Sequence, residues 1–167
     1  DLDPELRPIA LFLISNYVWT ISFGSRIPRQ LIVDELLSLY QYPEGKRFLE
    51  SIFQRARKHF LGVTGMTQHP SLLRDSTIVS NCGYVALMGQ EAASLDLLTD
   101  IFKLSKPEQQ LLLTFGKGDA LLLTHEQRLC VHFACSPLEY RYATSNPVDL
   151  ARYAEEEHPL TQTKGAS

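Results

Sequence analysis

A short apolar run that ends in two acidic residues, Leu31-Ile32-Val33 followed by Asp34-Glu35, is the feature that most constrains the fold. A continuous aliphatic run without alternation is typical of a strand buried on both faces, as in a parallel sheet. The segment 44–60 follows with apolar residues at helical spacing, and a second β segment covers residues 61–67. A strand, a helix and a strand in this order predict a right-handed crossover between parallel neighbours.

The alternation of strands and helices continues along the chain. The pattern predicts a short helix over 71–81, a third strand over 84–88, and helices over 91–102 and from 108 to about 115. Gly116 and Gly118 end this stretch, and two β runs at 120–124 and 129–134 are joined by 125–128 as a hairpin. The predicted fold class is therefore α/β, a mostly parallel sheet flanked by helices with a C-terminal β hairpin.

The two ends of the chain differ in character. A helix is expected to run to about Phe23, and because it is apolar nearly all round we expect it to be buried. Its apolar stretch from Ile9 to Phe23 falls short of the roughly 20 residues that a membrane-spanning helix needs. From Ser136 the apolar pattern thins, so residues 136–167 are expected to form a C-terminal extension with one helix over 146–153.

Composition limits the possible functions. The chain has 167 residues, of which 44% are apolar, which suits one domain or part of one. A net charge of -3 does not suggest a surface that binds nucleic acid by bulk charge alone, so any DNA contact would be local. Three cysteines without a signal-like start favour a reducing, cytoplasmic compartment. Cys130, His132 and Cys135 lack a second ligand pair, so we expect them to pack in the core and not to bind zinc.

The acidic pair lies where an open α/β sheet places its ligand, beyond the carboxyl end of a strand. Asp34 could hold Mg²⁺ directly or through water, and Glu35 could polarise the water that attacks the γ-phosphate of a nucleotide. The alternative is a solvated strand end, because an Asp-Glu pair after three aliphatic residues is common.

A second polar pair, Thr67-Gln68, ends the next predicted strand. An amide there could bond the γ-phosphate or the attacking water, which is the task of a sensor residue. We expect Gln68 to act in catalysis, and Asp34 and Thr67 to contact the nucleotide. The alternative is a turn glutamine that caps the helix beginning at Pro70.

A resemblance to a known family rests on four runs of residues: Leu31–Leu36 (LIVDEL), Gln54–His59 (QRARKH), Gly62–Gln68 (GVTGMTQ) and Ile78–Asn81 (IVSN). Further runs downstream are Leu104–Gln109 (LSKPEQ) and Gly116–Asp119 (GKGD). In these runs, from about Arg29 to Phe133, the chain resembles the RecA-like C-terminal motor domain of the large conjugation ATPases of type IV secretion systems, the VirB/TraC type (the VirB-four class).

The resemblance implies ATP and Mg²⁺ as cofactors, Asp34 and Glu35 as the Walker B pair, and Gln68 as the sensor. It implies a hexamer at the cytoplasmic face of a bacterial inner membrane, peripherally associated and working with other type IV secretion components. Arg55 and Arg57 would be candidates for an arginine that reaches a neighbouring subunit's nucleotide. Their alternative role is to stabilise the negative end of a helix dipole.

One departure from the family is large, because no Gly-x-x-x-x-Gly-Lys-Ser/Thr motif occurs in the sequence. Residues 1–167 are therefore expected to be the C-terminal part of a RecA-like ATPase domain whose phosphate-binding loop lies upstream, and to be inactive alone. Two alternatives stay open. One is a DNA-translocating coupling protein or pump of the same superfamily, and the other is a catalytically silent assembly domain.

Overall fold

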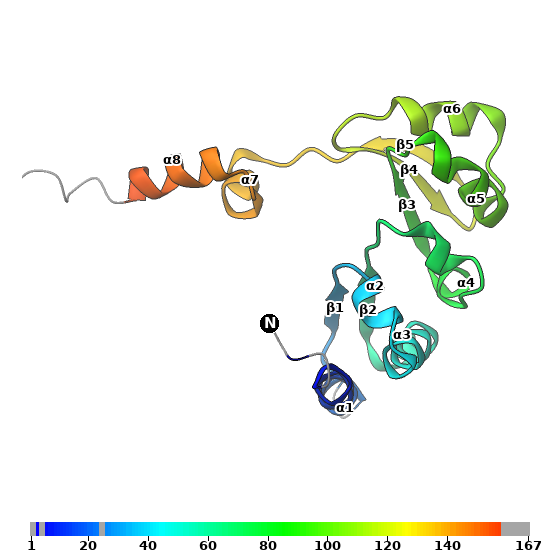
Figure 1. The fold of residues 1–167 in the computed structure, drawn as a ribbon, viewed down its shortest axis with the longest axis vertical. Helices are drawn as coiled ribbons and strands as arrows, with labels where there is room; N and C mark the ends of the chain where they lie inside the picture. Colours follow the sequence, from blue (N-terminus) through cyan, green and yellow to red (C-terminus); the bar gives the residue numbers. More distant parts are fainter. Residues whose placement is uncertain (1–2, 4–5, 24–25, 158–167) are drawn as a thin grey trace, which may run out of the picture. The chain divides into compact units, whose positions relative to one another are not determined.

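A computed structural model describes residues 3, 6–23 and 26–157 of the chain. The chain divides into two compact units, Asp1–Val131 and His132–Ser167 (Figure 1). The first unit is a mixed α/β structure whose strands form two separate sheets, a pair β1-β2 and a three-stranded sheet in the order β3-β4-β5. Within the described residues, no helix is both long enough and apolar enough to cross a membrane.

Strands β1 (Arg29–Val33) and β2 (Leu61–Gly65) pair in parallel, as the sequence predicted. The crossover between them consists of α2 (Leu37–Tyr40), α3 (Pro43–Arg55) and the 3-10 helix η1 (Ala56–His59). The apolar side of α3 packs on the pair, and Leu49 and Ile52 at its centre are fully buried. The other buried residues of this core are Val33, Leu36, Phe48, Ala56, Leu61 and Ile78.

The turn from α2 into α3 depends on a glycine. Gly45 lies in the first turn of α3 and is buried against α2. A Cβ atom on Gly45 would lie 2.2 Å from the backbone oxygen of Leu39 and 2.9 Å from its carbonyl carbon. Both atoms are backbone atoms, so the clash could be relieved only by moving one helix away from the other.

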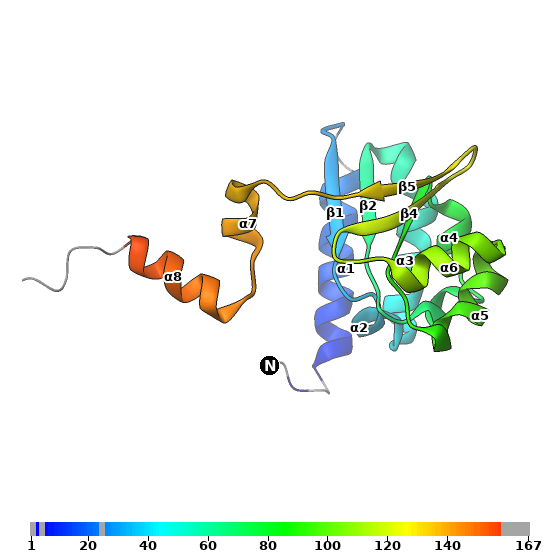
Figure 2. The ribbon, with the colours of Figure 1, turned by 90° about the horizontal axis from the view of Figure 1, so that it is seen from above.

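Helix α1 (Arg7–Phe23) lies alongside β1 and β2 and runs in the opposite direction to them (Figure 2), and it packs against α3. The ring centroids of Trp19 and Phe48 lie 6.3 Å apart, and those of Phe23 and His59 lie 3.6 Å apart. The expectation of a buried helix was wrong for the first half of α1. Among the described side chains from residue 9 to residue 17, five large apolar ones are 57% to 65% exposed: Ile9, Phe12, Leu13, Ile14 and Tyr17. An apolar pattern all round a helix indicates burial only if neighbours surround it, and α3 covers one side of α1 near its C-terminal end.

The second sheet corrects the prediction of a mostly parallel sheet. Strand β3 (Tyr84–Met88) pairs antiparallel with β4 (Asp119–Thr124), and it follows the short helices η2 (Pro70–Leu73) and α4 (Ile78–Asn81). Two helices, α5 (Ala92–Phe102) and α6 (Lys106–Thr114), connect β3 to β4. Two successive helices bring the chain back to the end where β3 finished, as the 2.9 Å hydrogen bond from the Gln90 N–H to the Leu112 carbonyl shows. The next strand must therefore run in the opposite direction.

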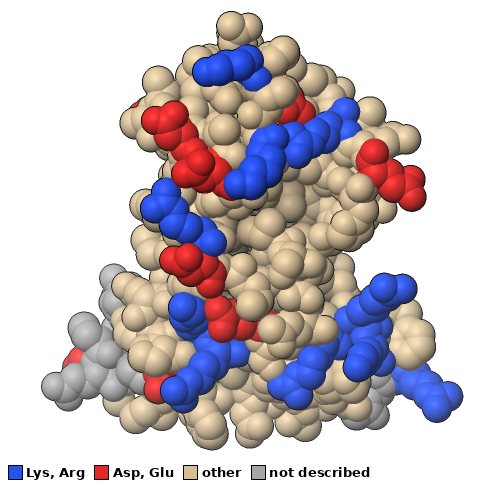
Figure 3. All heavy atoms as spheres, turned by 90° about the vertical axis from the view of Figure 1, so that its right-hand side faces the viewer, with Lys and Arg blue, Asp and Glu red and all other residues tan. Residues whose placement is uncertain are grey.

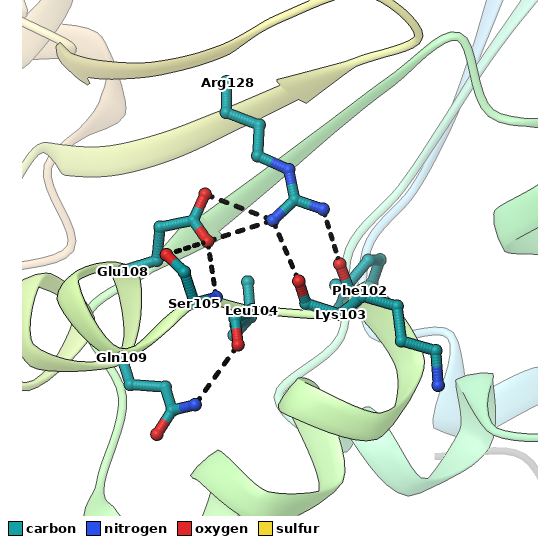
Figure 4. A network of polar contacts seen from close by, with 7 residues as sticks. All are labelled: Phe102, Lys103, Leu104, Ser105, Glu108, Gln109 and Arg128. Atoms are coloured by element: carbon teal, nitrogen blue, oxygen red, sulfur yellow. Dashed lines mark hydrogen bonds and ion pairs between the residues drawn. The ribbon is translucent and has the colours of Figure 1, made fainter.

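The predicted hairpin of β4 and β5 (Arg128–His132) is confirmed, and a network of polar contacts joins it to the helices (Figure 4). The Arg128 guanidinium donates to the carbonyl of Phe102 at 2.7 Å and to that of Lys103 at 3.3 Å, at the end of α5. It also forms a 3.0 Å ion pair with Glu108, which accepts 2.7 Å hydrogen bonds from the N–H and the hydroxyl of Ser105. One arginine therefore ties β5 to the end of α5 and to the start of α6.

The contacts of Glu108 change the pKa of its carboxyl. Desolvation raises this pKa, but the hydrogen bonds from Ser105 and the charge of Arg128 lower it by more, so that the pKa lies below its ordinary value. The Glu108 side chain is 15% exposed and that of Arg128 is 39% exposed. The ion pair therefore stabilises the fold above the ordinary pKa of a glutamate and is lost as the pH falls through the lowered value.

The second unit contains α7 (Pro137–Ala143) and α8 (Pro147–Glu157). The sequence predicted α8 in part but missed α7, which a capping box of Ser136 and Glu139 starts. The two helices are joined by a 2.9 Å hydrogen bond from the Tyr140 hydroxyl to Asp149. The last ten residues of the expected extension, 158–167, lie outside the described residues.

Replacing Gly45 with alanine tests the packing of α2 against α3. We expect the free energy of unfolding to fall by about 1–3 kcal/mol, because the added methyl group meets backbone atoms of Leu39. Gly83→Ala is the matched control, because a Cβ at Gly83 meets nothing within 4 Å. Denaturant unfolding checks both variants, and equal stabilities of the two would contradict the role of Gly45.

Replacing Arg128 with methionine tests the network around Glu108. Near neutral pH we expect the free energy of unfolding to fall by about 1–2 kcal/mol, because charge-assisted hydrogen bonds are lost. The difference from the wild type should shrink as the pH falls below 4.5, the ordinary pKa of a glutamate, because protonated Glu108 no longer pairs with Arg128.

Arg74→Met is the control for this series, since Arg74 is exposed and its side chain has no hydrogen bond or ion pair in the described part of the chain. Its effect should stay below about 0.5 kcal/mol at every pH. Urea unfolding at pH 7 and at pH 3 measures the series. An Arg128→Met deficit that is as large at pH 3 as at pH 7 would show that the ion pair contributes nothing.

Candidate functional site

The acidic pair and the Thr-Gln pair follow the carboxyl ends of neighbouring parallel strands, as the sequence predicted. The register pairs Val33 with Gly65, the last residues of β1 and β2. Two more backbone hydrogen bonds extend the contact beyond the strands: from the Met66 N–H to the Val33 carbonyl at 2.9 Å, and from the Leu36 N–H to the Met66 carbonyl at 2.8 Å. The residues that carry the predicted chemistry are therefore held together by backbone and not by side chains alone.

Glu35 bends back toward the second strand. Its φ of 55° lies in the left-handed region, where a residue with a side chain is uncommon. One oxygen of its carboxylate, Oε1, lies 3.4 Å from the hydroxyl of Thr67 and 3.4 Å from the N–H of Leu37. Glu35 and Thr67, which are 32 residues apart in the sequence, thus meet at this edge of the pair.

Asp34 and Gln68 are both exposed. Within the described residues, neither side chain has a hydrogen bond or ion pair, so the carboxylate and the amide are both available to a ligand. Carboxylate oxygens are ligands that Mg²⁺ prefers, and a magnesium ion bound with a nucleotide needs only one or two of them from the protein. Asp34 therefore suits the metal position that the sequence assigned to it.

The structure separates the two arginines. Arg55, the last residue of α3, donates to the hydroxyl of Ser51, and its guanidinium carbon lies 4.6 Å from the centre of the Trp19 ring of α1. Arg57 lies in η1, is exposed, and has no hydrogen bond or ion pair of its side chain in the described chain. Arg55 therefore has a structural role, because it links α1 to α3. Arg57 has no comparable partner among the described residues.

Basic side chains gather around α3 and η1. The exposed members on these two elements are Lys46, Arg47, Arg55, Arg57 and Lys58. Figure 3 shows basic side chains in the lower part of one face, where Figure 1 places α3, and further basic and acidic side chains intermixed above them. A local basic surface therefore exists although the chain as a whole carries a net charge of -3.

The Gly116–Asp119 run forms a tight turn. The Gly116 N–H donates to Asp119 Oδ2 at 2.9 Å, the Asp119 N–H donates to the Gly116 carbonyl at 3.2 Å, and Gly118 has a φ of 91°. The run leads into β4, as the sequence indicated, and the Asp119 side chain already takes one of its N–H groups. The turn is explained by the start of the hairpin and not by phosphate binding.

The cysteines lie outside this site. Cys82 is partly buried against the core of β1 and β2, and burial raises the pKa of its thiol. Cys130 and Cys135 are exposed, so the expectation that they pack in the core was wrong. Among the described residues, no three His, Cys, Asp or Glu side chains lie close enough together to hold a metal ion by themselves.

Three features of the site were missed from the sequence. The left-handed backbone of Glu35, the contact of its carboxylate with Thr67, and the stacking of Arg55 on Trp19 all depend on how segments meet. The first had a partial signal, since an abrupt change from strand to short helix after Asp34 requires a sharp turn. The other two had none, because contacts over 32 and 36 positions leave no local pattern.

The fold and the site define an α/β protein with an acidic pair and a polar amide at the carboxyl ends of two parallel strands. Among solved structures, the chain is similar to VirB4 of Thermoanaerobacter pseudethanolicus, with a TM-score of 0.68 and 25% sequence identity. The match covers 77% of this chain and 37% of that one, so the chain spans well under half of the length of the solved protein. No family model matches the sequence, and no curated protein matches it. The structural likeness supports, at the level of the fold, the resemblance that the sequence motifs indicated.

Proposed function

We propose that the chain is part of an ATP-hydrolysing motor subunit that energises a type IV secretion or conjugative transfer machine. The observation that carries this proposal is the meeting of Glu35 with Thr67 at the carboxyl ends of two parallel strands, beside the free side chains of Asp34 and Gln68. Likeness to VirB4 over 77% of the chain supports the same class of motor.

Each residue of the site has a chemical task in this proposal. Asp34 would hold Mg²⁺, which neutralises charge on the phosphate oxygens when it is bound. Glu35 takes the proton of the attacking water, and the amide of Gln68 orients that water or bonds the γ-phosphate. The core residues Val33 and Leu36 on either side of the acidic pair keep its backbone in place.

The rest of the ATP site would come from elsewhere. The sequence has no phosphate-binding loop, so we propose that these residues work in a larger RecA-like domain that supplies one. We further propose a hexamer that associates peripherally with the inner membrane of a bacterium from the cytoplasmic side and binds other components of the secretion machine.

Arg57 is the better candidate for an arginine that acts on a neighbouring subunit's nucleotide. Its guanidinium is exposed and has no partner in the described residues, whereas that of Arg55 is held by Ser51 and Trp19. A planar guanidinium can bond two phosphate oxygens at once, which is how arginine stabilises a transferring phosphoryl group.

The basic surface around η1 favours a second candidate, a DNA-translocating pump or coupling protein of the same superfamily. Arg57 and Lys58 are exposed neighbours there, and contacts of lysine and arginine with phosphates dominate non-specific DNA binding. A third candidate, a catalytically silent assembly domain, is favoured by the lack of a phosphate-binding loop in the sequence.

Replacing Glu35 with glutamine tests the catalytic assignment, in the protein extended to include a phosphate-binding loop. We expect kcat for ATP hydrolysis to fall by about 100-fold or more while ATP still binds, because the amide keeps the shape and cannot accept the proton. Steady-state hydrolysis and nucleotide binding, each measured with and without DNA, check this expectation. The control is Glu50→Gln, since Glu50 lies on α3 and bonds the Tyr40 hydroxyl at 3.2 Å, away from the strand ends.

The outcomes separate the three candidates. Hydrolysis that is lost in Glu35→Gln and indifferent to DNA supports the secretion motor, whereas stimulation by DNA supports the translocase. If the extended wild type binds no nucleotide, the result supports the third candidate, a catalytically silent assembly domain. Normal ATP turnover by Glu35→Gln would refute the assignment of Glu35 as the general base.

Replacing Arg57 with alanine tests the arginine. We expect kcat to fall by about 1,000-fold in the assembled protein with ATP binding retained, as when other trans-acting arginines are removed. Arg55→Ala should change kcat by no more than about threefold and lower the free energy of unfolding by about 0.5–1 kcal/mol, because it loses the stacking on Trp19. Lys58→Ala is the control for bulk charge. Equal losses of kcat in Lys58→Ala and Arg57→Ala would refute a specific guanidinium contact.

A further inference from the structure

We propose that Thr67 is a positioning residue that holds the carboxylate of Glu35, and that it does so through a chain of hydrogen bonds beginning at His69. This inference rests on the proposed function for its catalytic consequence, but the contact itself stands on the geometry. It assigns Thr67 a role different from the direct nucleotide contact that the sequence suggested.

The hydroxyl of Thr67 has its direction set by a neighbour. The His69 N–H donates to Thr67 Oγ1 at 3.0 Å, which occupies an acceptor position of the hydroxyl. The hydroxyl proton is then left to donate, and the carboxylate oxygen Oε1 of Glu35 lies 3.4 Å away. A hydroxyl that accepts from an N–H is a better donor, because hydrogen bonds in a chain polarise one another.

The carboxylate of Glu35 is held on one side only. Oε1 lies 3.4 Å from both Thr67 Oγ1 and the Leu37 N–H, while the other oxygen has no hydrogen bond from any residue that the structure describes. A general base needs one oxygen free to accept a proton and a fixed orientation of the group as a whole. The contacts of Oε1 provide the orientation and leave the second oxygen for water.

The backbone of Glu35 is fixed in the same way. Its φ of 55° is unfavourable for a residue with a Cβ, and such a conformation persists where the surroundings determine it. The Glu35 carbonyl accepts from the hydroxyl of Ser38 at 2.8 Å and from the Ser38 N–H at 3.1 Å. Two hydrogen bonds to the carbonyl of Glu35 and two to its carboxylate thus converge on this residue, and Thr67 provides the one from beyond the second strand.

Gln68, unlike Thr67, is not engaged through its side chain by neighbouring residues that the structure describes. It follows Thr67 directly, is exposed, and has no side-chain hydrogen bond within the described chain. The hydroxyl of Thr67 is engaged by His69 and Glu35, whereas the amide of Gln68 remains available to a nucleotide or to water.

Two substitutions of Thr67 test the positioning role in hydrolysis by the loop-containing protein. Thr67→Val keeps the shape and removes the hydroxyl, so we expect kcat to fall about 10-fold while KM for ATP changes by less than about twofold. Thr67→Ser keeps the hydroxyl and should restore kcat to within about twofold of the wild type. The matched control is Thr64→Val, since Thr64 is exposed on β2 and its hydroxyl bonds only the Gln30 side chain, at 2.8 Å, among the described residues.

A double-mutant cycle on thermal unfolding tests the contact without using hydrolysis. We expect Thr67→Val and Glu35→Met to lower Tm by less together than the sum of their separate effects, because each removes the same contact; methionine has no acceptor oxygen, whereas glutamine would keep one. Additive effects would overturn the contact whatever the activity shows. A rise in KM with unchanged kcat in Thr67→Val, or a failure of Thr67→Ser to restore kcat, would overturn the positioning role.

The two experiments also separate this inference from the proposed function. If the double-mutant cycle shows coupling but Glu35→Gln turns over ATP normally, then Glu35 is not catalytic, although its contact with Thr67 exists. If the cycle shows no coupling but Glu35→Gln is inactive, then the proposed function stands and Thr67 has no positioning role in it.

Discussion

The parallel hydrogen bonding of β1 with β2 is the constraint on which the candidate site depends. The pairing places Val33 opposite Gly65, and each chain then continues for two residues to Glu35 and Thr67. Two parallel strands need a crossover connection, and the helix in it is stabilised by packing its apolar side on the strands. Helix α3 does so, with Leu49 and Ile52 fully buried. The position of the carboxylate is therefore a consequence of hydrophobic packing some distance from it.

The site divides its polar groups between those that maintain its geometry and those left for chemistry. Thr67 and one oxygen of Glu35 satisfy each other, and the Asp34 and Gln68 side chains are exposed without partners in the described residues. The same division separates the arginines, because the stacking of Arg55 on Trp19 joins two helices while Arg57 is free in the described chain. An engaged group has a fixed direction but cannot bond a ligand as well, so both kinds are needed in one site.

Prediction from the sequence succeeded where the structure follows from local pattern. The β1-α3-β2 unit and the β4-β5 hairpin were predicted because their strands are continuous in sequence and their connections are simple. Prediction failed for the direction of β4 relative to β3: both helices between them were predicted, but not that together they return the chain to the end of β3, so that β4 pairs antiparallel with it. It failed also for the first half of α1, where residues such as Phe12 and Tyr17 are apolar but exposed.

The sequence by itself determined that two polar pairs, Asp34-Glu35 and Thr67-Gln68, follow the ends of neighbouring strands. A short aliphatic run marks β1 and a polar pair at its end is visible without a structure, but the expectation of a strand buried on both faces was wrong, because Ile32 is 62% exposed. Only the tertiary structure decided which of these groups are bound to one another and which are free. The contact of Glu35 with Thr67 and the left-handed turn that permits it depend on two strands meeting in one register. Register is a property of the packed pair, and neither strand specifies it alone.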